Sequence, residues 1–320
     1  MRRFLRHILL FLAILLPVYV LLLWMLGGTG GVRTVVTDMG NTGHLFSRVR
    51  ECHQHHDIDV LFIGSSHTYR TFDTRYYRAH GISCFNLGSS NQTPVQSLTL
   101  LTDHLDSLRP RCVVFEVHPD IIILDGVESC IDILCNTPLT PTTCRMALQT
   151  GNMKVVNTCL YAFYSQRIRH RLDNFVEDSI INLSAYVPGG YVEINDSLFH
   201  YSDSPSTTII PHSRQEKALR QCLSLLNQRG IPYLLVEVPD TRELRASYTN
   251  LDEFQRQMRD LGPFVCDTLP LVDTIHFYNS NHLNTKGTAI YNQWFLPILL
   301  KFMAEHGISP SIQNDTLCAY

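Results

Sequence analysis

Two serines and a histidine directly follow an apolar run near residue 60, an arrangement that suits nucleophilic catalysis. The stretch "DVLFIGSSH" ends in Ser65, Ser66 and His67. A serine on a strand-to-helix turn can expose its hydroxyl above a sheet, and its backbone N–H can face a developing oxyanion. The same serines could instead cap the next helix, because serine is favoured at that position. This motif alone does not decide between the two roles.

A base for such a serine has to come from another part of the chain. His282 lies in "NSNHLNTKG", just before a predicted helix, where it could take the serine proton and later return it. The stretch "NLGSSNQTP" offers the backbone N–H of Gly88 and the side-chain amide of Asn91 as oxyanion donors. A further polar stretch, "EVHPD" at residues 116–120, either contributes to the site or is a solvated strand end.

The elements that would position these motifs are short apolar runs alternating with longer amphipathic ones. Continuous apolar strands separated by helices favour a parallel sheet covered on both faces. We therefore predict a three-layer α/β/α domain with a mainly parallel sheet and an insertion at about 121–212, after the third strand. The predicted strands lie within 57–64, 82–88, 111–119, 231–240 and 263–268, and the predicted helices within 71–81, 94–110, 213–230, 251–262 and 284–305. Ser213 and Glu216 have the spacing of a capping box at the start of one helix.

The first 30 residues predict a membrane anchor. The basic start "MRRFLRH" precedes the uncharged run Ile8–Leu26, which as a helix would span about 28 Å, close to the hydrocarbon thickness of a bilayer. This run is longer than the apolar part of a secretory signal peptide, and no A-x-A pattern follows it. A signal peptide cleaved near Gly28 is the alternative. The positive-inside rule places the N-terminus in the cytoplasm and the main domain in the periplasm, outside the inner membrane.

These patterns divide the chain into four parts. We expect an anchor (1–30), a juxtamembrane linker (31–56), the main domain (57–310) and a C-terminal tail (311–320). The formal net charge is -3 and only 17% of residues are charged, which argues against nucleic acid as a partner. The 10 cysteines include no C-x-x-C pair, so a zinc ribbon is not expected; a disulfide within the loose cluster at 130–144 is the open alternative to buried thiols.

Three motifs together resemble a known family. "FIGSSHT", "FNLGSSNQT" and "NSNHLNTKG" look like the first, second and fifth sequence blocks of SGNH/GDSL hydrolases, in the same order. The resemblance is greatest to the membrane-anchored branch related to the D-alanyl transfer protein of teichoic acid synthesis and the alginate O-acetylation proteins; similar chains occur among envelope proteins of Bacteroidetes-type bacteria. It covers roughly residues 57–120 and 213–305. It implies an SGNH-hydrolase or flavodoxin-like fold that needs no metal or organic cofactor.

The resemblance also implies a role for individual residues. Ser66 matches the nucleophile, His282 the general base, and the amides of Ser66 and Gly88 the oxyanion donors, with Asn91 standing in for an asparagine that "EVHPD" lacks. The family has an acid three residues before the histidine, where this chain has Asn279. An asparagine oxygen can accept the imidazole Nδ1–H, but it cannot stabilise an imidazolium by charge. The site is then less active, served by another carboxylate, or without catalysis.

The sequence thus predicts one of two functions. The first is a membrane-anchored serine esterase or O-acyltransferase that acts on an acylated envelope glycan or a related ester. The second is a non-catalytic glycan-binding or assembly component with the same fold. In both cases a multispanning acyltransferase is an expected partner. Asn279 is the residue that favours the second prediction.

Overall fold

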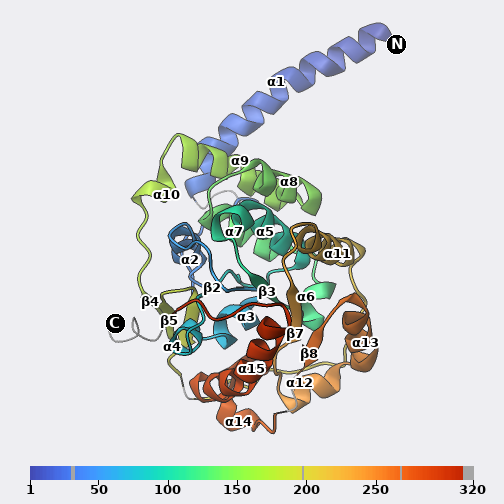
Figure 1. The fold of residues 1–320 in the computed structure, drawn as a ribbon. Coiled ribbons are helices and arrows are strands. Elements are labelled where there is room, and N and C mark those ends of the chain that lie inside the picture. Colours follow the sequence, from blue (N-terminus) through green and yellow to red (C-terminus); the bar gives the residue numbers. More distant parts are fainter. Residues whose placement is uncertain (30–32, 197, 267–268, 313–320) are drawn as a thin grey trace.

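A five-stranded parallel sheet forms the centre of the molecule (Figure 1). The computed structural model describes residues 1–29, 33–196, 198–266 and 269–312. The strand order is β2-β1-β3-β7-β8, and each strand lies within one of the five runs predicted from the sequence. The bounds are β1 Val60–Ile63, β2 Cys84–Asn86, β3 Cys112–Glu116, β7 Tyr233–Glu237 and β8 Phe264–Cys266. This order is that of doubly wound flavodoxin-like sheets, whose ligand site lies where β1 and β3 diverge.

Side chains of successive strand residues enter two separate cores, which produces the three predicted layers. In β1, Leu61 and Ile63 pack into one core, and Val60 and Phe62 pack into the other. The first core is covered by helices α2 (Leu45–Cys52), α5 (Pro94–Leu108), α11 (Ser213–Gln228), α12 (Arg242–Ser247) and α13 (Leu251–Leu261). The second is covered by α4 (Thr74–Ala79) and α15 (Thr285–Glu305). The α/β/α fold class is therefore confirmed.

Several boundaries differ from the prediction for local reasons. The run 71–81 is not one helix, because Phe72 is extended and Asp73 caps a new helix by accepting the N–H of Arg75; α3 (Ser66–Thr71) precedes it. The capping box predicted at Ser213 is absent, because His212 is the N-cap of α11. The predicted linker 31–56 contains α2, whose Leu45, Val49 and Cys52 belong to the first core. The predicted tail lies outside the described residues from position 313 onward.

The insertion between β3 and β7 packs as part of the main domain. Its helices are α6 (Pro119–Ile123), α7 (Val127–Asn136), α8 (Pro141–Thr150), α9 (Met153–Arg167) and α10 (Arg171–Asn174), and its small antiparallel sheet is β4 (Ile180–Ile181), β5 (Ser184–Val187) and β6 (Tyr191–Ile194). Apolar residues of α7, α8 and α9 enter the first core. The cysteines at 130, 135 and 144 are free thiols.

The turn between β5 and β6 is joined to the end of β2. The N–H of Asn86 donates to the carbonyl of Gly189 at 2.8 Å. The buried guanidinium of Arg48 donates to the carbonyl of Gly190 at 2.9 Å and to the carbonyl of Gly88 at 2.8 Å. One side chain of α2 thus ties the insertion to the loop that follows β2, beside the predicted site.

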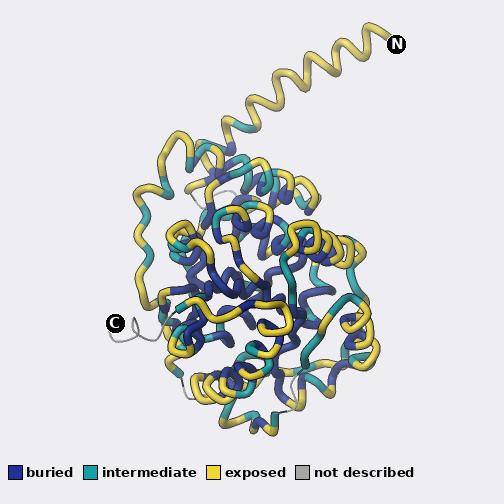
Figure 2. Tube along the Cα trace, viewed as in Figure 1, coloured by how far each residue is buried: buried dark blue, intermediate teal, exposed yellow. Residues whose placement is uncertain are grey.

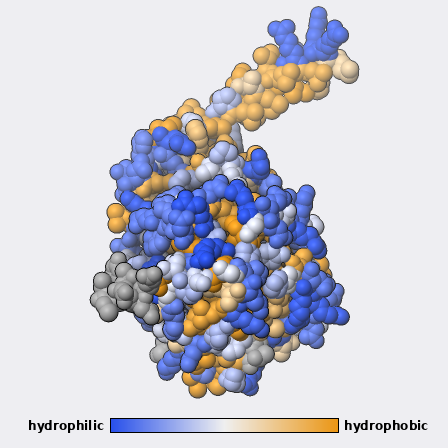
Figure 3. Space-filling view, in the orientation of Figure 1, coloured by the Kyte–Doolittle hydropathy of each residue, from blue (hydrophilic) through white to orange (hydrophobic). Residues whose placement is uncertain are grey.

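The remaining elements lie at the two ends of the chain. Near the C-terminus, α14 (Asp273–His276) precedes a hairpin of β9 (Phe277–Asn279) and β10 (His282–Leu283). At the N-terminus, α1 (Arg2–Leu26) projects from the domain and is exposed over most of its length, before a short 3-10 turn at Gly27–Thr29 (Figures 1 and 2). Figure 3 shows α1 as an apolar rod with a hydrophilic N-terminal tip. It is one helix that is long and apolar enough to cross a membrane.

The turn at Gly190 allows a direct test of the insertion's docking. Its φ is +91°, and a Cβ there would collide with the carbonyl oxygen of Asn86. We expect Gly190→Ala to cost roughly 1–2 kcal/mol for the left-handed backbone and a further 1–3 kcal/mol for the overpacking. Gly151→Ala is the control, because its φ of +67° is also left-handed but no atom of the described residues lies within 4 Å of the added Cβ. If the two variants had equal midpoints of urea unfolding, the close contact between the β5–β6 turn and the end of β2 would be contradicted.

Candidate active site

The turn after β1 holds the two serines in different environments. Ser65 is the N-cap of α3 and is 0% exposed, whereas Ser66 is the first residue of the helix and is 8% exposed. The carboxylate of Glu116, at the end of β3, accepts the N–H of Ser65 at 2.6 Å. This close approach requires Gly64, because a Cβ there would collide with Glu116. Ser66 is thus the more exposed of the two serines.

Ser66, His282 and Asn279 form one hydrogen-bonded chain. Ser66 Oγ lies 2.8 Å from His282 Nε2, and His282 Nδ1 lies 3.0 Å from Asn279 Oδ1. The two partners are brought together by distant segments, because α3 follows β1 whereas β10 lies 216 residues further along the chain. These distances lie within the range for a nucleophile and its general base. The geometry therefore suits proton transfer from Ser66 to His282.

The hairpin of β9 and β10 determines which atom of the Asn279 side-chain amide faces His282. Asn279 and His282 are paired across the hairpin, so their side chains lie side by side. Asn279 Oδ1 also accepts the backbone N–H groups of Asn281 at 3.2 Å and His282 at 2.9 Å. Because both backbone groups can only donate, the amide must present its oxygen. The proton of the neutral ring therefore sits on His282 Nδ1, and Nε2 is left to accept the Ser66 hydroxyl.

The three predicted oxyanion donors lie in unlike settings. The N–H of Ser66 is at the first position of α3, where a helix offers no internal acceptor. The N–H of Gly88 donates to Asn86 Oδ1 at 3.1 Å, and the side chain of Asn91 donates to Glu128 at 2.9 Å. Both of these donors already have acceptors, so the oxyanion roles of Gly88 and Asn91 stay predictions.

Electrostatics keep the His282 ring neutral. Burial, and after it the positive charge of Arg70 and the neighbouring His118, lower the pKa of His282 well below its ordinary value. Arg70 lies four residues after Ser66 on α3, and its guanidinium donates to the Ser184 hydroxyl of the insertion at 3.4–3.5 Å. Asn279 adds no negative charge to offset these effects. The ring is thus neutral over a wide pH range, and an imidazolium at this position is poorly stabilised.

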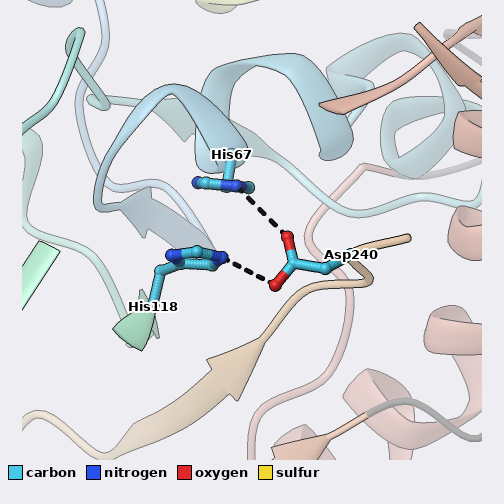
Figure 4. Close-up of side chains that lie close together, drawn as sticks. All are labelled: His67, His118 and Asp240. Atoms are coloured by element: carbon cyan, nitrogen blue, oxygen red, sulfur yellow. Dashed lines mark hydrogen bonds and ion pairs between the residues drawn. The ribbon is translucent and has the colours of Figure 1, made fainter. Parts of the chain in front are cut away.

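A second cluster, formed by His67, His118 and Asp240, lies beside His282 (Figure 4). His67 stacks between His282 and His118, with ring centroids 5.1 Å and 4.0 Å apart. Asp240, which follows β7, accepts from His118 Nε2 at 2.8 Å and lies 3.8 Å from His67 Nε2. His67 Nδ1 in turn lies 2.9 Å from Ser65 Oγ. Burial, together with the neighbouring histidines His118 and His282, lowers the pKa of His67 well below its ordinary value.

His67, His118 and Asp240 are of types that ligate metals, but their geometry fits a hydrogen-bonded network better. All three are buried, and their ligand atoms lie within 4.8 Å of one another. The two rings are nearly parallel at 14°, so their Nε2 lone pairs run side by side rather than converging. His118 Nδ1 accepts the N–H of Asp120 at 3.2 Å, which leaves the proton on Nε2 for Asp240. A metal bound at Nε2 would have to displace that proton.

The structure also decides among residues that the sequence left open. Glu116 and His118, which were predicted either to contribute or to be solvated, are buried and lie at the site. Asp240 and Arg70 were not predicted. An acid directly after the fourth strand, and a cation one helical turn after Ser66, were the signals that could have pointed to them.

Comparisons with known proteins find solved structures of low similarity to this chain. No protein-family model and no curated protein matches the chain. A solved candidate acylhydrolase from Bacteroides fragilis is 12% identical with a TM-score of 0.37, over 79% of this chain and 95% of that one. A gut microbial diltiazem-metabolizing enzyme is 12% identical with a TM-score of 0.27, over 76% of this chain and about half (47%) of that one. Similarity at this level does not define an activity, so the site has to be interpreted from its own geometry.

Restoring an acid at position 279 tests the partner of His282. Asn279→Asp would keep an oxygen facing the three N–H donors and add a negative charge, which raises the pKa of His282 and stabilises its imidazolium. We expect the labelling of Ser66 by a fluorophosphonate to become faster by up to about tenfold, or about 1.4 kcal/mol, for each pKa unit regained. Asn281→Asp is the control, because it adds the same charge on the turn. Equal rates for both variants would show that position 279 does not act on His282.

The charge of Arg70 should be visible in the pH dependence. Because only neutral His282 is a base and its pKa is depressed, the labelling rate should stay constant as the pH falls through 6.5 and decline only well below it. In Arg70→Gln the pKa rises, so the decline should begin at higher pH. Arg256→Gln, on the exposed face of α13, should leave the profile unchanged. If the labelling rate of Arg70→Gln declined at the same acidic pH as that of the wild type, Arg70 would not lower the pKa of His282.

Proposed function

We propose that the chain is a serine ester hydrolase or O-acyltransferase whose nucleophile is Ser66. The single observation that carries this proposal is the hydrogen-bonded chain from Ser66 Oγ through His282 to Asn279. A hydroxyl is a weak nucleophile unless a positioned base removes its proton, and the free Nε2 of His282 is placed to do so. The position of the site, between the ends of β1 and β3, is where sheets of this order bind ligands.

The proposed reaction proceeds through an acyl-serine. Ser66 Oγ attacks the ester carbonyl while its proton passes to His282 Nε2, and the N–H of Ser66 stabilises the oxyanion, with Gly88 as the predicted second donor. Collapse of the tetrahedral intermediate breaks the ester bond, and His282 returns the proton to the departing alkoxide. An acceptor hydroxyl then attacks the acyl-serine while His282 Nε2 takes its proton. Collapse of the second tetrahedral intermediate releases the acylated acceptor, and His282 returns the proton to Ser66 Oγ. Water as the acceptor gives a hydrolase, and a sugar hydroxyl gives a transferase.

We further propose that this chemistry takes place at the periplasmic face of the inner membrane, on an acylated envelope glycan or a related ester. The support is α1, an apolar helix preceded by Arg2, Arg3 and Arg6. Retention of α1, rather than cleavage as a signal peptide, is supported by its packing, because Leu23 is buried against Tyr161 of α9. A multispanning acyltransferase that supplies acyl groups across the membrane is the partner this location suggests.

A non-catalytic glycan-binding or assembly role is the second candidate, and Asn279 favours it. Without a carboxylate beside His282, the imidazolium has no opposite charge in contact with it. Such a component would keep the fold and bind glycan without turning it over. The two candidates differ in the reactivity of Ser66.

A fluorophosphonate probe distinguishes the two functions. We expect covalent labelling of the purified full-length protein, lost completely in Ser66→Ala, together with hydrolysis of p-nitrophenyl acetate. Ser65→Ala is the matched control, because it removes a neighbouring hydroxyl that is fully buried, and it should keep labelling at Ser66. A folded protein that neither reacts with the probe nor turns over the ester would rule out the enzyme and leave the binding role.

A further inference from the structure

Helix α9 carries an apolar stripe on the face that points away from the core. The stripe consists of Met153, Val156, Leu160 and Phe163, whose spacings of three, four and three residues place them on one helix face. Met153 is 65% exposed and Phe163 is 50% exposed, while Val156 and Leu160 are half-buried. The opposite face of α9 is apolar as well, and it packs into the domain through Val155 and Ala162. Helix α1 covers part of the stripe, because Leu160 packs beside Leu23 and Phe163 stacks on Trp24 with ring centroids 6.4 Å apart. Met153 and Phe163 nevertheless stay largely exposed.

The position of α1 indicates what lies against the outer face. The second half of α1 packs along α9: Tyr19 donates to Asn157 at 2.7 Å, and the Trp24 indole N–H donates to the carbonyl of Leu160 at 3.0 Å. Trp24 also stacks on Tyr164, with ring centroids 5.3 Å apart. From Tyr19 to Leu26, the end of α1, is about 10 Å along the helix axis at 1.5 Å per residue. The last third of the apolar helix therefore runs beside α9 instead of ending above it.

Three arginines lie at the C-terminal end of the apolar stripe. Arg167 ends α9 on the same helix face as Leu160 and Phe163, and Arg169 and Arg171 follow it. Arg169 and Arg171 line a cavity of about 510 Å³ together with Trp24 and Tyr164. Cations beside an apolar helix face, with aromatic rings between them, are the pattern of helices that lie in the headgroup region of a bilayer.

We propose that the outer face of α9 is a lipid-binding surface that rests in the boundary between headgroups and acyl chains of the bilayer that α1 crosses. The proposal rests on the membrane anchoring proposed above. Interfacial helices bury their apolar face to a depth of roughly 5–10 Å, which matches the overlap between α1 and α9. The stripe contacts acyl chains, and the three arginines meet anionic headgroups. The catalytic domain is thereby held in one orientation on the membrane instead of swinging from a flexible anchor.

Site-specific photocrosslinking in vesicles tests this surface. A benzophenone amino acid replaces Phe163 or Met153 in the full-length protein, which is reconstituted in vesicles of phosphatidylcholine and phosphatidylglycerol and analysed by mass spectrometry. Two positions serve as controls: Leu15, which is exposed in the middle of α1, and Ile275, which is 50% exposed on α14 at the opposite end of the molecule (Figure 1). We expect phospholipid adducts at positions 15, 153 and 163, and no phospholipid adduct at position 275.

Each other outcome overturns the proposal in a distinguishable way. Adducts at position 15 but not at 153 or 163 would show that α1 spans the bilayer while α9 stays above it. Adducts with a second copy of the chain at position 163 would assign the stripe to a protein interface. Absence of adducts at position 15 as well would remove the anchor itself, and with it the proposed location of the enzyme, without affecting the reactivity of Ser66.

Discussion

The hydrogen bond between Ser66 and His282 depends on one oxygen atom, Oδ1 of Asn279. That atom accepts two backbone N–H groups and the imidazole Nδ1–H within the hairpin Phe277–Leu283. The hairpin thereby settles the orientation of the amide, the tautomer of the ring and the availability of Nε2 at once. The same oxygen in an aspartate would do all of this and add a charge. What Asn279 lacks is therefore stabilisation of the imidazolium, whereas the arrangement of the base is complete.

The surroundings of His282 increase the consequence of that missing charge. Burial and the nearby Arg70 disfavour the imidazolium, and the buried carboxylate of Asp240 is hydrogen-bonded to His118. The stacked rings of His67 and His118 support the position of the His282 ring without an opposite charge in contact with it. In such a site the His282 ring stays neutral and can accept a proton, but the driving force for proton transfer from Ser66 is modest. This is compatible with a slow transferase or esterase.

The sequence predicts the sheet well because its strands are buried on both faces and read as continuous apolar runs. It also predicts the Ser66 and His282 partnership, through the spacing of "NSNH" and its place before the last helix. Arg70 and Asp240 could not be placed in the same way. Arg70 required knowledge that α3 begins at Ser66, and Asp240 required the strand order, which puts β7 next to β3. The docking of the insertion depends on contacts of Arg48 with Gly88 and Gly190, which no local pattern encodes.

The structure separates two serines that the sequence left side by side, and this is the point at which the account can be tested most directly. The full-length protein is mixed with p-nitrophenyl acetate, quenched in acid during turnover and digested, and the acetylated residue is located by mass spectrometry. We expect the acetyl group on Ser66, because its hydroxyl is the one that contacts His282 Nε2. An acetyl group on Ser65 or His67, or turnover without any acyl-serine, would contradict the proposed mechanism.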